Sequence, residues 1–181
     1  MPLRCYNMDM HESLTALIRD IPDFPKPGIR FKDITPLLAD PSGLSLAVEL
    51  MANPWRDDRP DLVVGAESRG FIFGTALAQS LSCGFVPVRK PGKLPSKTVS
   101  IEYELEYGSD TLQMHADAIR PGQKVLLVDD LIATGGTAKA ACDLIKNLGG
   151  DVLGLVVLIE LAELKGRDLM GDVEVHSLLR Y

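Results

Sequence analysis

Cysteine is scarce in this chain, whose 181 residues contain only Cys5, Cys83 and Cys142. Their scattered positions match no zinc-binding spacing and no disulfide framework, so we expect unpaired thiols in a reducing compartment. Long apolar runs are missing as well, because none approaches the ~20 residues of a membrane span. Residues 1–10 lack the apolar segment of a signal peptide. These absences predict a cytoplasmic protein without a membrane partner.

An excess of positive charge is also absent. The chain has 19 Lys and Arg against 25 Asp and Glu, a formal net charge of −6, which argues against a nucleic-acid partner. An anionic ligand would then need a local group of basic residues. The remaining composition is typical of a globular protein, with 46% hydrophobic and 24% charged residues. A chain of this length is near the size of one domain with its own core.

Apolar segments alternate with helical patterns through most of the chain. The pattern predicts strands at 62–66, 85–88, 125–128, 152–159 and 173–178, helices at 11–21, 41–51, 70–81 and 138–145, and a helical turn at 165–170. This alternation is typical of an α/β fold, a mostly parallel twisted sheet with helices on both faces. A proline-rich loop at 22–28, and a mobile loop followed by an antiparallel hairpin at about 90–115, interrupt it.

The most informative segment is an apolar strand that ends in Asp129 and Asp130 and leads through a glycine-rich loop into a helix. Such a loop offers backbone N–H groups and the positive end of a helix dipole to an anion. The two acids suit sugar hydroxyls, or a metal shared with the ligand. The residues of the glycine-rich loop are Ala133, Thr134, Gly135, Gly136 and Thr137.

Two other phosphate-binding loops do not match this segment. It lacks the Lys-Ser or Lys-Thr pair of a Walker loop and the Gly-x-Gly-x-x-Gly spacing of a dinucleotide site. A sugar phosphate therefore fits better than a nucleoside triphosphate. The alternative is an ordinary strand–turn–helix with a Gly-Gly turn.

Two further turns place positive charge at strand ends, where ligands bind in open α/β sheets. Arg69 follows the strand at 62–66, and its guanidinium suits a diphosphate. The alternative is a surface arginine at a helix start, which the helix dipole disfavours. Arg89, Lys90 and Lys93 follow the next strand and form a candidate diphosphate clamp, with solvated loop charge as the alternative.

Two segments are ambiguous from their residues alone. In the loop at 24–35, Phe31 could stack on a planar base and the backbone near Arg30 could read a base edge. The residues alone favour Phe31 as a core side chain in a connecting loop. Glu106 could accept or donate a purine proton, although a solvated hairpin is the simpler interpretation. The histidines form no spaced pattern, and we assign none a catalytic role.

Taken in order from Phe24 to the C-terminus, these segments resemble the type I phosphoribosyltransferases, and among them the enzymes specific for adenine. The signature at 129–137 is common to many members, whereas the first and fifth motifs quoted next indicate adenine. The motifs are Phe24-Pro-Lys-Pro-Gly28, Asp33-Ile-Thr-Pro36, Glu67-Ser-Arg-Gly-Phe71, Arg89-Lys-Pro-Gly-Lys-Leu-Pro95, Leu105-Glu-Tyr-Gly108 and the signature itself. Arg30 departs from the small apolar residues that also occur there, and residues 1–10 match no motif.

The resemblance implies transfer of the phosphoribosyl group of 5-phosphoribosyl diphosphate (PRPP) to adenine, which gives AMP and diphosphate with Mg²⁺ as cofactor. It implies that the glycine-rich loop binds the 5′-phosphate and that Asp129 and Asp130 hold the ribose hydroxyls. Arg69, with Lys90 and Lys93, would bind the diphosphate. Mg²⁺ would be held mainly by PRPP and water, without protein ligands.

The resemblance also implies a base site and an assembly. Adenine would stack between Phe31 and Leu161, with its edge read by the backbone of Arg30. Glu106, with Arg69, would be catalytic, on a flexible hood that closes over the site. The family further implies a homodimer, a cis peptide near Glu67, and a single domain of residues 1–181 in which about 1–35 form a small N-terminal hood segment with the base-binding loop.

Two other functions remain open from the sequence. One is a related transferase that acts on another base, which the base-binding loop would decide. The other is a PRPP-binding regulator without catalysis, which would be expected to add a DNA-binding domain and a basic patch.

Overall fold

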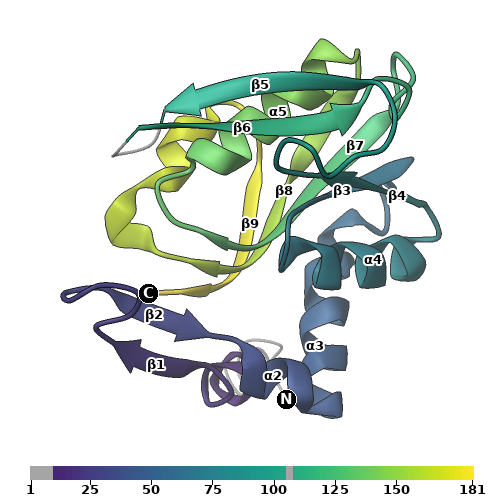
Figure 1. Cartoon of the computed structure of the whole chain (residues 1–181). Coiled ribbons are helices and arrows are strands. Elements are labelled where there is room, and N and C mark those ends of the chain that lie inside the picture. Colours follow the sequence, from purple (N-terminus) through teal and green to yellow (C-terminus); the bar gives the residue numbers. More distant parts are fainter. Residues whose placement is uncertain (1–9, 105–107) are drawn as a thin grey trace. The chain divides into compact units, whose positions relative to one another are not determined.

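The computed structural model describes residues 10–104 and 108–181. The chain divides into two compact units, Met1–Leu50 and Met51–Tyr181. The first unit contains a short hairpin and helical segments, and the second contains the main sheet (Figure 1). That the chain acts as a single domain stays a prediction.

In the first unit, Arg19–Pro22 (β1) pairs antiparallel with Arg30–Asp33 (β2). The predicted helix at 11–21 is therefore wrong at its end, since the described helix covers 10–15 and Ile21 pairs with Phe31. The apolar spacing of this segment is too short to separate a helix from a helix followed by a strand. The segment at 24–35, interpreted as a connecting loop, also contains the strand β2, which the prolines before it concealed.

The first unit continues into helices. Thr35–Ala39 (α2) precedes Pro41–Ala52 (α3), which confirms the predicted helix at 41–51. Asp40 stands between them, and its Oδ1 accepts the N–H of Gly43 at 2.6 Å. This bond satisfies one of the free donors in the first turn of α3. A short 3₁₀ turn, Asn53–Trp55 (η1), follows α3.

The second unit contains a five-stranded parallel sheet in the order β4-β3-β7-β8-β9, which confirms the predicted α/β sheet (Figure 1). Its strands are Leu62–Ala66 (β3), Gly84–Val88 (β4), Lys124–Ile132 (β7), Asp151–Glu160 (β8) and Val175–Arg180 (β9). The edge position of β4 fits Pro87, which has no N–H to donate to a further strand. β7 and β8 are buried almost throughout because helices and the hairpin described below cover them.

Two helices connect the parallel strands. Gly70–Leu81 (α4) joins β3 to β4, and Gly136–Asn147 (α5) joins β7 to β8. β3 and β7 are neighbours in the sheet. The crossover from β3 leads to β4 on one side of this pair, and the crossover from β7 leads to β8 on the other side. Right-handed connections therefore place α4 and α5 on opposite faces. The point where the strand order reverses, between β3 and β7, is where open α/β sheets bind ligands.

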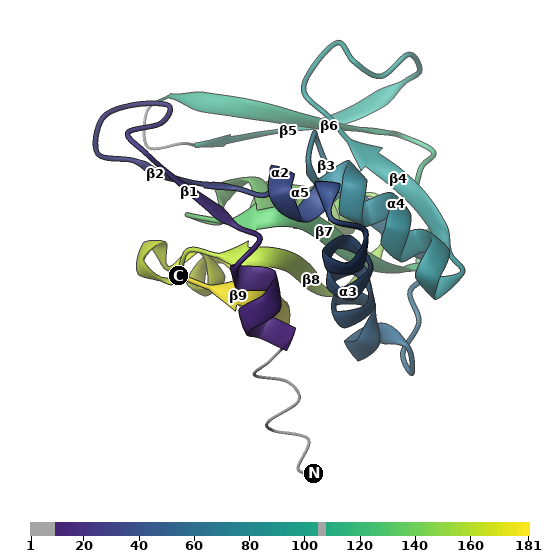
Figure 2. The ribbon, with the colours of Figure 1, turned by 90° about the horizontal axis from the view of Figure 1, so that it is seen from below.

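A separate hairpin packs against α5. Thr98–Glu104 (β5) and Ser109–His115 (β6) pair antiparallel, which confirms the predicted hairpin, and β5 contacts α5 (Figure 2). Two 3₁₀ turns, Ala162–Leu164 (η2) and Gly166–Met170 (η3), connect β8 to β9. The last strand begins two residues later than predicted. No helix among the described residues has the length and apolar content to cross a membrane.

Candidate functional site

The glycine-rich loop forms a pocket at the carboxyl end of β7. The pocket has a volume of about 200 Å³ and is lined by Asp129, Leu131, Ile132, Ala133, Thr134, Gly135, Gly136, Thr137 and Ala138. All five residues predicted to bind the phosphate are therefore brought together with Asp129. Among the described residues, no side chain caps the start of α5. Its first N–H groups and its dipole are thus available to an anion.

The shape of this loop depends on a close approach of two backbones. Gly135 has a φ of +86°, and a Cβ added there would overlap the carbonyl oxygen of Gly166. A Cβ added at Gly166 would in turn overlap the carbonyl oxygen of Ala133. Because neither glycine has room for a side chain, the first residue of η3 forms one wall of the loop. Sequence reasoning missed Gly166, which is distant in the chain.

Of the two acids near the end of β7, Asp130 is buried and Asp129 is half-buried. The N–H of Asp130 donates to Asp129 Oδ1 at 2.8 Å, and Arg69 Nε lies 3.0 Å from Asp130 Oδ2. Burial, with the neighbouring charge of Asp130, raises the pKa of Asp129 well above its usual range. Burial also raises the pKa of Asp130, although the charge of Arg69 opposes this. Asp129 lines the pocket and Asp130 is its chain neighbour, and such carboxyl groups suit a ligand that donates hydrogen bonds, such as the hydroxyls of a sugar.

The predicted Arg69 turn lies directly beside these acids. Its peptide bond between Glu67 and Ser68 is cis, as the family resemblance implied. Gly70 starts α4 so close to β7 that an added Cβ would lie 2.9 Å from Asp129 Oδ1. The ends of β3 and β7 therefore present Arg69, Asp129 and Asp130 at one point, where the strand order of the sheet reverses.

The basic loop after β4 is held by an acid that sequence reasoning did not assign. Glu67 accepts from Arg89 Nε at 2.8 Å and from Lys93 Nζ at 3.0 Å. Arg89 also donates to the carbonyl oxygen of Lys93 at 3.1 Å and lies over the ring of Phe71. Burial raises the pKa of Glu67, but the bonds from Arg89 and Lys93 outweigh it and leave this pKa below its usual range.

The hairpin connects the basic loop to the glycine-rich loop. Lys90 forms an ion pair with Asp110 and lies over the ring of Tyr103. The hydroxyl of Tyr103 is 3.4 Å from Asp110 Oδ2 and shares a hydrogen bond of 3.2 Å with the hydroxyl of Thr137. Asp110 and Tyr103 carried no sequence signal beyond their alternation in the hairpin. Thr137, one of the predicted phosphate ligands, thus already has a hydroxyl partner.

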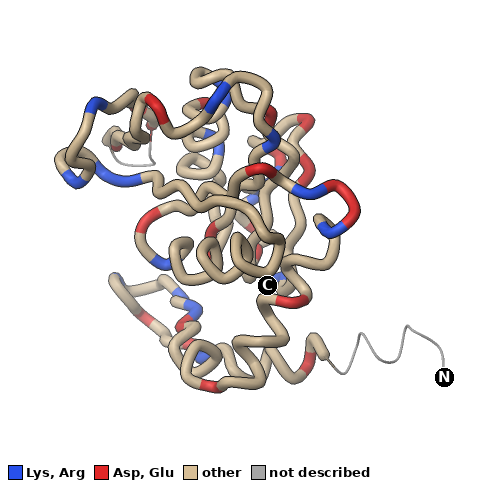
Figure 3. The backbone as a smooth tube through the Cα atoms, turned by 90° about the vertical axis from the view of Figure 1, so that its right-hand side faces the viewer, with Lys and Arg blue, Asp and Glu red and all other residues tan. Residues whose placement is uncertain are grey.

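Each cation predicted to bind diphosphate has an acidic partner in this structure. Arg69 pairs with Asp130, and Lys90 with Asp110. Lys93 pairs with Glu67. Basic and acidic residues are interspersed along the described backbone (Figure 3), in keeping with such local pairing. A polyanion would bind here by exchanging these partners, which is possible because the three cations are each more than a third exposed.

The residues predicted to contact a base fall in both units. Arg30 and Phe31 belong to β2, where Arg30 pairs with Asp20 and the Phe31 ring meets the ring of Phe24 edge-on at 5.2 Å. Leu161 follows β8, and its N–H donates to the carbonyl oxygen of Ile132 at 2.9 Å. Their role in base binding stays a prediction. Glu106 lies outside the described residues, and its predicted role is likewise untested.

Replacement of Glu67 by Gln is expected to reduce the free energy of unfolding at pH 7 by about 1–3 kcal/mol, since two charge-assisted hydrogen bonds are lost. The lowered pKa of Glu67 means that its contribution is present above the unfolded pKa of about 4.3 and is lost as pH falls through the folded pKa. Urea unfolding at pH 7 and pH 3.5 measures the difference in free energy of unfolding between the wild type and the variant, which should be smaller at pH 3.5.

The matched control is Glu102→Gln, which removes the charge of an exposed carboxylate that accepts one bond from Ser109. A change within about 0.5 kcal/mol is expected there. If Glu67→Gln were no less stable than this control at pH 7, the anchoring role of Glu67 would be wrong.

Comparison with known proteins gives a consistent result. The family model described as a phosphoribosyl transferase domain matches residues 35–179. The adenine phosphoribosyltransferase of Acidobacterium capsulatum is 55% identical over 170 residues, which cover 94% of each chain. That of Clostridium perfringens is 57% identical over 169 residues, covering 93% of this chain and 98% of its own.

Solved structures agree with the sequence relatives. The adenine phosphoribosyltransferase of Rhodothermus marinus superposes with a TM-score of 0.92 at 52% identity, covering 96% of this chain and 99% of its own. The Saccharomyces cerevisiae enzyme, solved with adenine and an imino-altritol bisphosphate, has a TM-score of 0.91 at 39% identity and covers 95% of this chain and 99% of its own.

Proposed function

The chain belongs to the phosphoribosyltransferase family, among the adenine phosphoribosyltransferases of purine salvage, and from that premise we propose how its residues transfer the 5-phosphoribosyl group of PRPP to adenine. The products are AMP and diphosphate. One observation supports this most directly: the glycine-rich pocket, the pair Asp129 and Asp130, and Arg69 meet where the order of the strands reverses. A phosphate, a ribose and a diphosphate each have a fitting group there.

PRPP would bind by its three parts. The 5′-phosphate enters the pocket at 133–137, where backbone N–H groups and the hydroxyls of Thr134 and Thr137 donate to it. The 2′- and 3′-hydroxyls of the ribose donate to Asp129 and Asp130. The diphosphate binds Arg69, Lys90 and Lys93, which exchange their acidic partners for its oxygens. Binding two ends of one ligand fixes the ribose between them and so lowers the entropic cost of reaction.

The transition state of such a transfer resembles a ribosyl oxocarbenium ion with a departing diphosphate. The carboxylates of Asp129 and Asp130 face the ribose and stabilise its positive charge, while Arg69 and the basic loop stabilise the charge that develops on diphosphate. The hairpin β5–β6 and the loop before it exclude water, which would otherwise hydrolyse PRPP. Glu106 stays the predicted proton donor or acceptor for adenine.

Mg²⁺ is the proposed cofactor, and it would be held mainly by PRPP and by water. The described residues contain no cluster of three His, Cys, Asp or Glu side chains that could hold a metal. The oxygen-rich acid pair fits a hard cation that arrives with the ligand. When bound, the ion neutralises charge on the leaving diphosphate.

The assay that tests the activity offers the purified chain PRPP and Mg²⁺ with adenine, hypoxanthine, xanthine or uracil. Adenine should react to AMP with a kcat/KM about 10⁴-fold above that of hypoxanthine, which lacks the 6-amino group. Turnover of another base without adenine turnover would instead indicate a related transferase. PRPP binding without turnover of any base would favour the regulator.

Assembly and location remain proposals that rest on the family. We propose a cytoplasmic homodimer that binds neither nucleic acid nor membranes. The net charge of −6 supports the absence of a nucleic-acid partner. Size-exclusion chromatography with light scattering would measure the oligomeric state, and a monomer at micromolar concentration would contradict the dimer.

A further inference from the structure

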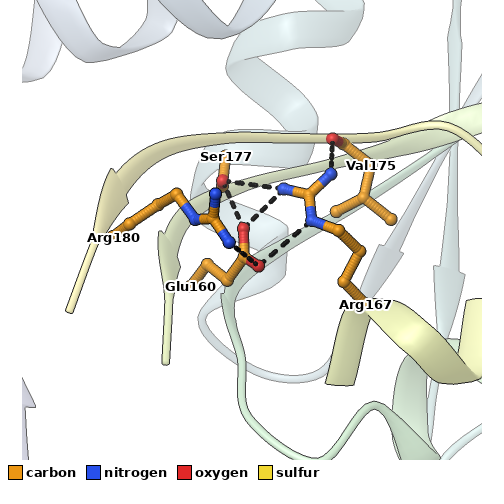
Figure 4. A network of polar contacts seen from close by, with 5 residues as sticks. All are labelled: Glu160, Arg167, Val175, Ser177 and Arg180. Atoms are coloured by element: carbon orange, nitrogen blue, oxygen red, sulfur yellow. Dashed lines mark hydrogen bonds and ion pairs between the residues drawn. The ribbon is translucent and has the colours of Figure 1, made fainter. Parts of the chain in front are cut away.

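A dense polar network lies beside the site at the end of β8, and the function proposed so far does not use it. Glu160, the last residue of β8, is only 3% exposed. Its carboxylate accepts from Arg167 Nε at 3.1 Å and from Arg167 Nη2 on the other oxygen (Figure 4). Ser177 donates to the same carboxylate at 2.6 Å, and Arg180 at 3.2 Å.

Arg167 is the centre of this network. Besides its two bonds to Glu160, it donates to the carbonyl oxygen of Val175 and to the hydroxyl of Ser177 (Figure 4). One guanidinium therefore ties the end of β8 to β9. The bonds from Arg167, followed by that from Ser177, lower the pKa of Glu160 to about 2. The carboxylate is thus charged at neutral pH.

The Glu160–Arg167 pair closes a loop of chain, one end of which contacts the residue before the glycine-rich loop and the other the loop itself. At one end, the N–H of Leu161 donates to the carbonyl oxygen of Ile132, the residue just before Ala133. At the other end, the backbone of Gly166 packs against Gly135 so closely that neither residue has space for a Cβ. Each partner of the ion pair is therefore the chain neighbour of a residue that supports the phosphate pocket.

We propose that Glu160 and Arg167 are a positioning pair that fixes the glycine-rich loop in the shape that binds the 5′-phosphate of PRPP. The inference rests on the proposed function, because it concerns the same pocket. Arg167 sets the place of Gly166, and Gly166 forms the wall against Gly135. Glu160 sets the place of Leu161, which is held to the end of β7.

The geometry favours positioning over stabilisation alone. A buried ion pair is weak support for stability, because desolvation of the two charges offsets much of their attraction. A bidentate guanidinium with three different acceptors, by contrast, fixes direction as well as distance. Loss of such a pair should therefore alter the pocket in molecules that remain folded.

The test compares three variants of the full chain with the wild type. Arg167→Met keeps most of the side-chain volume and removes every hydrogen bond of the guanidinium. Arg167→Lys keeps the positive charge but loses the bidentate geometry. Arg180→Met is the matched control, because it removes one bond to the same carboxylate from a side chain that is 60% exposed and belongs to β9. The readouts are the thermal midpoint, the Kd for PRPP by calorimetry, and AMP formation.

Arg167→Met should weaken PRPP binding and lower kcat/KM about 10- to 100-fold, because a displacement of about 1 Å caused by a distant mutation can cost about 100-fold. Arg167→Lys should fall between it and the wild type, and Arg180→Met should change the Kd by less than about 3-fold. If Arg167→Met does not fold, the Kd of the Lys variant decides.

A folded Arg167 variant with a lower thermal midpoint but the PRPP Kd of the wild type would overturn the proposal. Equal losses of PRPP affinity in Arg180→Met and Arg167→Met would also overturn it, since Arg180 bonds to Glu160 from β9 and is not a chain neighbour of Gly166. A wild type that forms no AMP, but whose PRPP affinity depends on Arg167, would refute the proposed function and leave the positioning pair standing.

Discussion

The double replacement of Asp129 and Asp130 by Asn is expected to give a folded protein that binds PRPP two to four orders of magnitude more weakly than the wild type. Each carboxylate would lose charge-assisted hydrogen bonds to a ribose hydroxyl, which contribute about 1.5–3 kcal/mol apiece, so that both together correspond to roughly 10²- to 10⁴-fold in Kd. Isothermal calorimetry with PRPP and Mg²⁺ measures the change directly.

The same variant is expected to be more stable than the wild type at neutral pH. Burial raises the pKa of both carboxyl groups, so the folded state binds more protons than the unfolded state between pH ~3.9 and the folded pKa values. Wild-type stability therefore falls as pH rises through that window. Above it, the folded protein bears the full free-energy cost of keeping both carboxyl groups charged. Asn avoids this cost, and the exposed Arg69 retains water as a partner.

The control for this prediction is Asp143→Asn in α5, which removes the charge of a carboxylate that pairs with Lys139 one helical turn away. Its PRPP affinity should match the wild type. A double variant that kept wild-type affinity would refute the ribose assignment. A double variant that bound PRPP weakly but was less stable than the wild type at pH 7 would contradict the argument from burial.

The bounds of several strands and helices could be predicted because turn residues and helix-start residues occur at their ends in the sequence. β3 and α4 have the predicted bounds, since the apolar run at 62–66 stops at a charged turn and a helical pattern starts at Gly70. The glycine-rich loop was found for a similar reason. Its residues are contiguous, and strand, acids, glycines and helix occur in an order that few other sites share.

What the sequence could not predict depends on contacts between distant residues. Glu67 meets Lys93 across 26 positions, and Tyr103 meets Thr137 across 34. Neither pairing leaves a periodic pattern in the chain. The hairpin β1–β2 was missed because Pro22 ends the first strand and Pro25 and Pro27 lie between the two strands, and these prolines concealed the strand that follows. The first two misses reflect contacts between distant residues, whereas the hairpin is a local pairing that its prolines concealed.

A third contact between distant residues is that of Gly135 with Gly166. Gly135→Ala tests it and is expected to abolish most PRPP binding. The residue has a left-handed φ of +86°, which costs an alanine about 1–2 kcal/mol. The added methyl would also overlap the carbonyl oxygen of Gly166, and forced overpacking costs about 1–3 kcal/mol more. Because backbone opposes backbone, only a shift of the loop or of η3 relieves the overlap.

Alanine variants of two other glycines separate the conformational cost of the left-handed φ from the steric cost of the overlap. Gly122 has nearly the same φ, +81°, and no atom within 4 Å of an added Cβ, so Gly122→Ala carries the conformational cost alone. Gly136 has neither problem, since the nearest atom would lie 3.5 Å away. Gly136→Ala should therefore fold with unchanged stability or a slight gain from better helix propensity.

The expected order of stability is Gly136→Ala, then Gly122→Ala, then Gly135→Ala, measured by urea unfolding. PRPP affinity should fall at least about 100-fold in Gly135→Ala, because a shift of the loop by about 1 Å is enough to lose that much. It should stay near wild type in Gly122→Ala. If Gly135→Ala lost no more stability than Gly122→Ala and kept its affinity, the wall formed by Gly166 would not determine the shape of the pocket.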